Sequence, residues 1–118
     1  MIFERAVMNS KEFAEYVAQD LLSGVEGVTT RFMFGGYGLY RNGLIFGIII
    51  AGEIYFKMDS ENQKKYEAAG SRPFTYARDG KMCAMKYWLV PPCVLESRDQ
   101  ILQWALLSCS ISRSKNKA

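Results

Sequence analysis

The sequence predicts one α+β domain, in which an antiparallel sheet and a set of helices form two layers. Three observations support this fold class: helical apolar spacing near both ends, extended segments rich in β-branched and aromatic residues between them, and turn dipeptides that join those segments. A length of 118 residues and a hydrophobic content of 49% are sufficient for one core. Because hairpins join successive strands, a parallel sheet with crossover helices is excluded. The expected order is α-β-β-β-α-β-β-α, with five strands.

The first helix is expected from Asn9–Ser10 to Ser23. Asn9 or Ser10 followed by Glu12 is a capping signature, and Gly24 is expected to end the helix in a left-handed conformation. The apolar stripe has helical spacing and consists of Ala14, Val17, Ala18, Leu21 and Leu22.

A three-stranded meander is expected next, and glycines interrupt its first strand. Asn42-Gly43 and Ala51-Gly52 are the expected tight turns, since both positions of such a turn need a positive φ. Asp79-Gly80 is expected to join two further strands in the same way. The extended segments are Thr29–Phe34, Leu39–Arg41, Leu44–Ile50, Glu53–Met58, Phe74–Arg78 and Lys81–Val90.

Two more helices complete the expected domain. One begins at Asp59-Ser60 and stops at Gly70, and the last begins at Ser97 and runs to Cys109. The expected organisation is an N-terminal extension over 1–8, one domain over 9–109 and a basic flexible tail over 110–118.

Composition excludes several classes of function. The chain has no histidine, and its three cysteines are widely spaced, so a zinc site, a disulfide framework or a Cys-His or Ser-His pair is not expected. We therefore expect no catalytic residue, no metal and no cofactor. No apolar run is long enough to span a bilayer and no secretory signal is evident, so a cytoplasmic location without membrane contact is expected.

The net charge of +3 comes from the C-terminal segment, where Arg113, Lys115 and Lys117 lie without a nearby acid. The rest of the chain carries equal numbers of basic and acidic residues. A short basic tail supports a nucleic-acid partner only weakly, because nonspecific binding needs many phosphate contacts.

The glycine-rich segment Gly35-Gly36-Tyr37-Gly38 has two interpretations. It lacks the Lys-Ser/Thr ending of a phosphate-binding loop and leads into a strand, which favours a bulge or tight bend. A ligand contact there is the alternative.

One face of the sheet is expected to be basic and aromatic. If Leu44, Phe46, Ile48 and Ile50 share the core face, continued by Ile54, Phe56 and Met58, the opposite face carries the candidate partner-binding residues. By alternation these residues are Arg31, Tyr55, Lys57, Lys86 and Trp88. Such a face can bind an acidic protein or single-stranded nucleic acid, and an ordinary solvated face is the alternative.

Five ordered segments between Asn9 and Ser108 carry a family resemblance: Arg31–Tyr40, Gly52–Asp59, Tyr66–Gly70, Pro73–Tyr76 and Met85–Trp88. Together they resemble the TfoX/Sxy N-terminal domain, a family associated with bacterial competence regulation. The resemblance implies an α+β fold similar to the secretion-chaperone-like architecture, and it implies no enzymatic activity or cofactor. It covers the N-terminal domain of such regulators and no C-terminal one.

We therefore expect a noncatalytic regulatory or interaction domain whose partner is a protein, for example a transcription regulator. One alternative is a nucleic-acid-binding module that uses the basic sheet face and the C-terminal tail. A second is a small-molecule site or an enzyme near the glycine-rich bend. Pairing of an exposed strand edge across a two-fold axis leaves a homodimer open.

Overall fold

The computed structural model describes residues 9–33 and 35–117, and the segment expected as an N-terminal extension lies outside this part. The elements, in order, are α2 (Ser10–Tyr16), the π-helical turn η1 (Val17–Leu21), β1 (Val28–Met33), β2 (Gly36–Arg41), β3 (Leu44–Ile50), β4 (Glu53–Lys57), α3 (Gln63–Ala68), β5 (Pro73–Arg78), β6 (Lys81–Leu89), α4 (Pro92–Leu95) and α5 (Arg98–Lys117).

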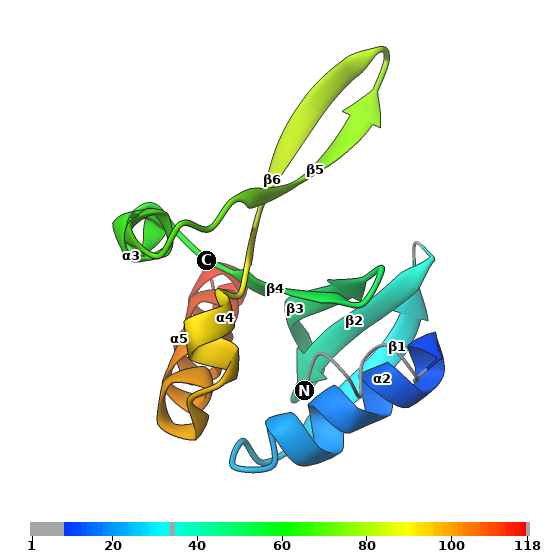
Figure 1. Cartoon of the computed structure of the whole chain (residues 1–118), viewed down its shortest axis with the longest axis vertical. Coiled ribbons are helices and arrows are strands. Elements are labelled where there is room, and N and C mark those ends of the chain that lie inside the picture. The colour runs from blue at the N-terminus through cyan, green and yellow to red at the C-terminus, as the bar shows by residue number, and fades with distance from the viewer. Residues whose placement is uncertain (1–8, 34, 118) are drawn as a thin grey trace.

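The expected α+β class and antiparallel sheet are confirmed. The sheet has the strand order β1-β2-β3-β4-β6-β5, and every neighbouring pair is antiparallel. It has one strand more than expected, because the glycine-rich segment separates β1 from β2 instead of interrupting a single strand. The helices α2 and α5 lie apart from the β5–β6 hairpin, which extends away from them (Figure 1).

The three predicted turn dipeptides are confirmed by their backbone angles. In each, both central residues have a positive φ, as a two-residue hairpin turn with the native strand twist requires. The pairs are Asn42-Gly43, Ala51-Gly52 and Asp79-Gly80.

The start of α2 is also confirmed, but Gly24 is not a left-handed cap. Asn9 Oδ1 accepts the Glu12 N–H at 2.8 Å, while Glu12 Oε1 accepts the Asn9 N–H at 3.1 Å, which completes a capping box. Gly24 does not have a positive φ. A Cβ atom there would lie 2.6 Å from Leu102 Cδ1, so close packing against α5 explains this glycine.

The last helix is longer than expected, because α5 continues past Cys109 to Lys117 and includes most of the segment predicted as a tail. Ile111 is buried, and the buried Ser112 donates its hydroxyl hydrogen to the carbonyl of Ile45 on β3. One turn earlier, the Ser108 hydroxyl donates to the Lys57 carbonyl at 2.7 Å. Hydrogen bonds to the backbone of the sheet thus anchor the helix beyond its expected end.

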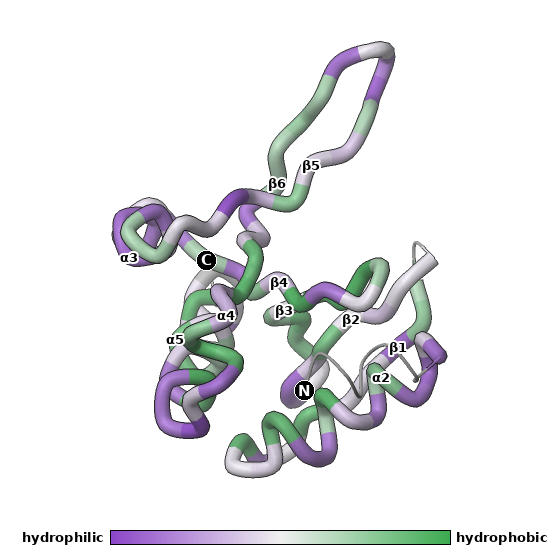
Figure 2. Tube along the Cα trace, viewed as in Figure 1, coloured by the Kyte–Doolittle hydropathy of each residue, from purple (hydrophilic) through white to green (hydrophobic). Residues whose placement is uncertain are grey.

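Helices and sheet share one main core. Apolar residues of α2, η1, α4 and α5 pack against one face of the sheet, which is termed the helix-covered face. Figure 2 shows hydrophobic residues along β3 and in the helices, and hydrophilic residues at the end of the β5–β6 hairpin. The fully buried large side chains include Leu22, Leu39, Phe46, Phe56 and Ile101.

A bulge in β3 overturns the expected assignment of its faces. Leu39 is paired with Gly47 but Tyr40 with Ile45, so Phe46 is an extra residue in β3. Phe46 packs in the main core, whereas Ile48 belongs to a second cluster on the other face. Strict alternation therefore fails, because an extra residue reverses the facing of those that follow. This second face is termed the open face.

Candidate functional site: a projecting β-hairpin and the open sheet face

The hairpin formed by β5 and the first part of β6, residues 73–86, is termed the arm. Strand β6 pairs with β4 through Tyr87, Trp88 and Leu89, and the Lys86 carbonyl accepts the Met58 N–H just beyond β4. The residues from Lys81 to Ala84 pair with β5 alone. The arm consequently leaves the rest of the sheet and ends in the Asp79-Gly80 turn (Figure 1). Its outer strand, β5, is one edge of the sheet.

The open-face cluster attaches the arm to the sheet. Ile48, Tyr55 and Tyr87 form the buried part of this cluster, and partly buried Phe74 and Met85 pack against it. The Phe74 ring meets the Tyr55 ring edge-on, with centroids 5.3 Å apart. Such pairs add to the effect of apolar burial, so the base of the arm has its own small core.

Beyond this base, most of the arm is exposed to solvent. Every residue from Thr75 to Met82 is exposed, and Met82 keeps 70% of its surface accessible. Arg78 lies directly opposite Lys81 in the register. Two like charges in that position are destabilising, and Asp79 in the turn is the acidic residue nearest to them in the sequence.

The structure separates the five candidate partner-binding residues between the two faces of the sheet. Tyr55 belongs to the open-face cluster, and Lys57, two residues along β4, shares its face. The guanidinium of Arg31 lies over the ring of Tyr40, 5.5 Å from the centroid. A Cβ on Gly38, the partner of Arg31, would touch both Tyr40 and the open-face residue Ile45. Arg31 therefore joins Tyr55 and Lys57.

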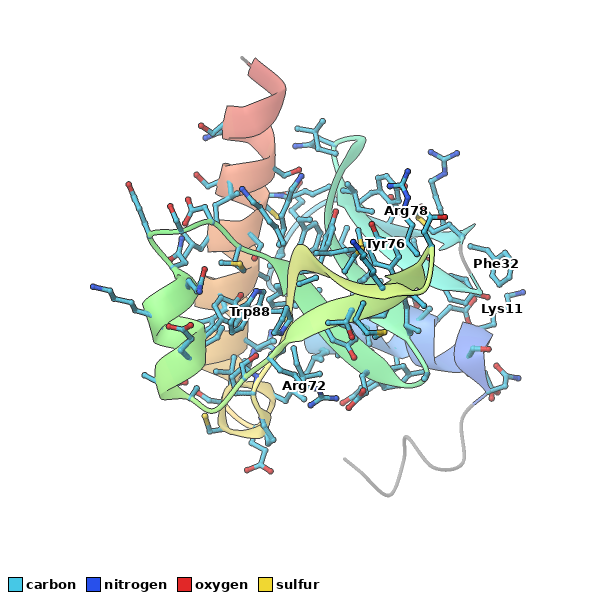
Figure 3. All side chains as sticks on the ribbon, turned by 90° about the horizontal axis from the view of Figure 1, so that it is seen from above. Lys11, Phe32, Arg72, Tyr76, Arg78 and Trp88 are labelled. Carbon is cyan, nitrogen blue, oxygen red and sulfur yellow. The ribbon has the colours of Figure 1, made fainter. Side chains whose placement is uncertain are left out.

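Lys86 and Trp88 are on the helix-covered side, so the expectation that all five share one face is wrong. Trp88 packs against the main core and contacts the ring of Tyr66 on α3, with centroids 6.3 Å apart. Figure 3 shows Trp88 beside the helices, while Tyr76 and Arg78 lie toward the other end of the arm. Lys86 shares the side of Trp88 because Tyr87, between them, faces Lys57.

The open face is also more apolar than expected. Tyr55 is only 6% exposed, and its hydroxyl donates to Glu53 Oε1 at 3.1 Å. The same oxygen is paired with Arg72 at 3.3 Å. Burial, and then the neighbouring Glu53 carboxylate, raise the pKa of Tyr55. Its role in partner binding stays a prediction.

The exposed arm residues Tyr76, Arg78, Lys81 and Met82 are not among the partner-binding residues predicted from the sequence. A signal was present, since the residues flanking Asp79-Gly80 lack the regular row of large apolar side chains that a strand over a core carries. That pattern indicates a hairpin with two solvated faces.

The glycine-rich bend is explained by packing. Gly35 has a positive φ in the turn after β1, and Gly36 and Gly38 lie in β2. A Cβ on Gly36 would lie 2.2 Å from the Ile49 carbonyl oxygen, and one on Gly38 would lie 2.7 Å from Met33 Sδ. Close approach within the protein thus accounts for the two strand glycines without a ligand.

Two cavities lie elsewhere. The first has a volume of about 170 Å³ and lies between α2, η1, α4 and the strands β4 and β6. Its lining is mostly apolar, with Glu53 and Glu96 as its charged members among the described residues. The second has a volume of about 130 Å³ and lies where the β2–β3 turn meets α5. Cys109 lines this second cavity, and burial raises the pKa of its thiol, although nearby Arg41 opposes the shift.

The architecture defines a class: a small α+β domain with helices on one face of an antiparallel sheet and a projecting hairpin. The model of the TfoX N-terminal domain family matches residues 20–111, so the chain belongs to this family. No curated protein matches the sequence. Among the described residues, no helix is both long enough and apolar enough to cross a membrane.

Proposed function

We propose that the chain is a noncatalytic, competence-related regulatory domain that binds a protein partner through the arm and the adjoining open face. Membership of the TfoX N-terminal domain family supports the regulatory class. The observation that carries the proposal is the exposure of every residue from Thr75 to Met82.

The arm lacks the buried contacts that would offset the free energy of ordering it. A two-stranded hairpin is at best marginally stable in water, and the outer half of this one contributes no residue to either core cluster. Ordering its backbone costs roughly 1–2 kcal/mol per residue, which burial does not offset here. A partner that covers the arm would supply the missing burial.

The chemistry of the arm indicates the kind of partner. Arg78 and Lys81 form a cationic pair at its end, while Tyr76 and Met82 offer apolar surface. The exposed edge of β5 can accept an added strand, in which main-chain hydrogen bonds give affinity. We therefore propose an extended acidic segment with an apolar side chain as the target, with Lys57 on β4 at the margin of the contact, whereas Arg31 lies on β1 at the far edge of the sheet.

The test compares the wild type with the double variant Arg78→Glu/Lys81→Glu in affinity capture from the native cell. A nuclease-resistant partner should be lost from the double variant. A matched control is Lys11→Glu/Lys64→Glu, which makes the same change of charge at exposed positions of α2 and α3. Retention of the partner by the arm variant contradicts the proposal.

Nucleic-acid binding is the second candidate, supported by the shape of the arm. A two-stranded ribbon fits the major groove of B-DNA, and the cationic pair lies at the end of this one. That candidate predicts nuclease-sensitive capture and an affinity that falls steeply with salt. Few cations on the arm make it the weaker candidate. Homodimer formation through a free edge stays a prediction, which sedimentation tests.

A further inference from the structure

The cavity between the β2–β3 turn and α5 is unusual in its charge. Two guanidinium groups line it, those of Arg41 and Arg113, and among the described residues no carboxylate does. The other lining residues combine hydrogen-bonding and apolar side chains: Asn42, Ser110, Cys109, Leu44 and Leu106.

The two arginines come from elements far apart in the sequence. Arg41 ends β2, and its Nε–H donates to the Glu26 carbonyl at 2.9 Å, which fixes the plane of the guanidinium. On α5, Cys109 and Arg113 are four residues apart and therefore lie on one side of the helix. The fold thus brings together two cations that lie far apart in the sequence.

Structural roles explain each arginine only in part. The bond to Glu26 uses one of the donors of Arg41, and a hydrogen bond with the Cys109 thiol uses another, which leaves further donors of this guanidinium. Arg113 lies near the C-terminus of α5, where a cation favours the helix dipole. Neither role accounts for two arginines and no carboxylate among the described residues that line this cavity. An anion bound there would be attracted by both cations.

We propose that this cavity binds the phosphate group of a small phosphate monoester. Guanidinium groups bind phosphate oxygens through paired hydrogen bonds, and Asn42 and Ser110 add neutral donors. The volume of about 130 Å³ equals that of roughly four liquid water molecules, which suits one phosphate group and part of its substituent. Leu44 and Leu106 offer that substituent an apolar wall.

A nucleic-acid backbone fits this cavity less well. Nonspecific nucleic-acid binding depends on many phosphates spread along a surface, whereas this cavity holds one such group. The proposal is independent of the arm, which lies at the opposite edge of the sheet from β1 and β2.

The test is a titration of the full chain in a phosphate-free buffer, followed by amide NMR shifts. Inorganic phosphate and phenyl phosphate should both shift the amides of Asn42, Gly43 and Ser110 in a saturable way. Phenyl phosphate should bind more tightly, because its ring reaches the leucine wall. Phenol, which lacks the anion, should shift none of these amides.

Variants identify the site. Arg113 is exposed, so Arg113→Gln should leave the fold intact and weaken phenyl phosphate binding at least tenfold. Arg113→Lys should weaken it less, since charge remains but the paired geometry is lost. The charge-matched control Lys64→Gln, on an exposed position of α3, should leave the affinity unchanged.

A second readout is alkylation of cysteine. Bound phenyl phosphate should slow the reaction of Cys109 with iodoacetamide and leave exposed Cys93 unaffected. Amide shifts next to every basic residue on the surface would overturn the proposal, because they would indicate nonspecific binding of the anion. An affinity for phenyl phosphate that Arg113→Gln leaves unchanged would also overturn it. Binding of an oligonucleotide at these amides without binding of phenyl phosphate would overturn it as well.

Discussion

The ring of Phe74 on β5 packs edge-on against the ring of Tyr55 on β4, and this contact ties the arm to the body of the sheet. The two strands are not hydrogen-bonded neighbours, because β6 lies between them. Side-chain packing on the open face therefore attaches the arm to the sheet, in addition to the backbone pairing of β6 with β4.

Replacing Phe74 by alanine should loosen the arm without unfolding the domain. The lost ring contact is worth roughly 0.5–1.5 kcal/mol beyond area burial, and Phe74 lies outside the main core. Hydrogen exchange should accelerate mainly at amides between Thr75 and Ala84. Phe46→Ala is the control: it removes a fully buried ring and should cost about 3–5 kcal/mol globally. Equal protection losses throughout the chain for both variants would contradict this view.

Gly36→Ala should destabilise the domain more than Gly24→Ala does. The new methyl group at Gly36 meets the backbone carbonyl of Ile49, which cannot move without disturbing the β2–β3 pairing. We expect a loss of about 2–3 kcal/mol in the free energy of unfolding. At Gly24 the close neighbour is the end of the Leu102 side chain, which can change rotamer. Urea unfolding measures the free energy of unfolding of both variants. A smaller loss for Gly36→Ala than for Gly24→Ala would contradict the packing explanation.

Two truncations of α5 should differ in stability, because only the shorter chain loses contacts that anchor the helix to the sheet. A chain that stops after Cys109 loses the buried Ile111 and the hydrogen bond from Ser112 to the Ile45 carbonyl. An orphaned buried group alone costs about 1–3 kcal/mol. A chain that stops after Ser114 retains both contacts and should unfold close to the wild-type temperature. Equal melting temperatures for the two truncations would show that these contacts contribute nothing.

Stability should fall above about pH 10, the unfolded pKa of tyrosine, because of Tyr66. Burial beneath Trp88 and Trp104 raises the pKa of Tyr66 well above its usual value, and a hydrogen bond with Ser108 opposes this only partly. A raised folded pKa means that its contribution is complete below the unfolded pKa and is lost as the pH rises beyond it. Urea midpoints across alkaline pH measure the slope. Tyr66→Phe should reduce the fall of the urea midpoint with pH. An unchanged fall would show that other groups cause it.

Much of the fold follows from local chemistry. Asn42-Gly43, Ala51-Gly52 and Asp79-Gly80 identify their turns because few residues tolerate two successive positive φ angles. The capping box of Asn9 and Glu12 likewise sets the start of α2 from residues three apart. The family resemblance agrees with the match over residues 20–111.

The candidate sites depend on longer-range effects. Alternation along β3 predicts a single apolar row, but the bulge at Phe46 sends Ile48 to the opposite face. The local signal for that extra residue is Gly47, because an isolated glycine within a strand suggests a bulge. Lys86 and Trp88 were assigned to the wrong face because the facing of β6 is set by its pairing with β4, which is not adjacent in sequence. The cavity between Arg41 and Arg113 could not be predicted, since it exists only where β2 meets α5.

Sequence alone thus determined the class of fold, the turns that divide the chain into strands, and the family. These depend on backbone preferences and apolar spacing within a few residues of each other. Only the tertiary structure decided which face each strand presents, that the arm projects from the sheet, and that two distant arginines share a cavity. Those features result from strand register and helix packing, in which each contact joins residues that the chain itself keeps far apart.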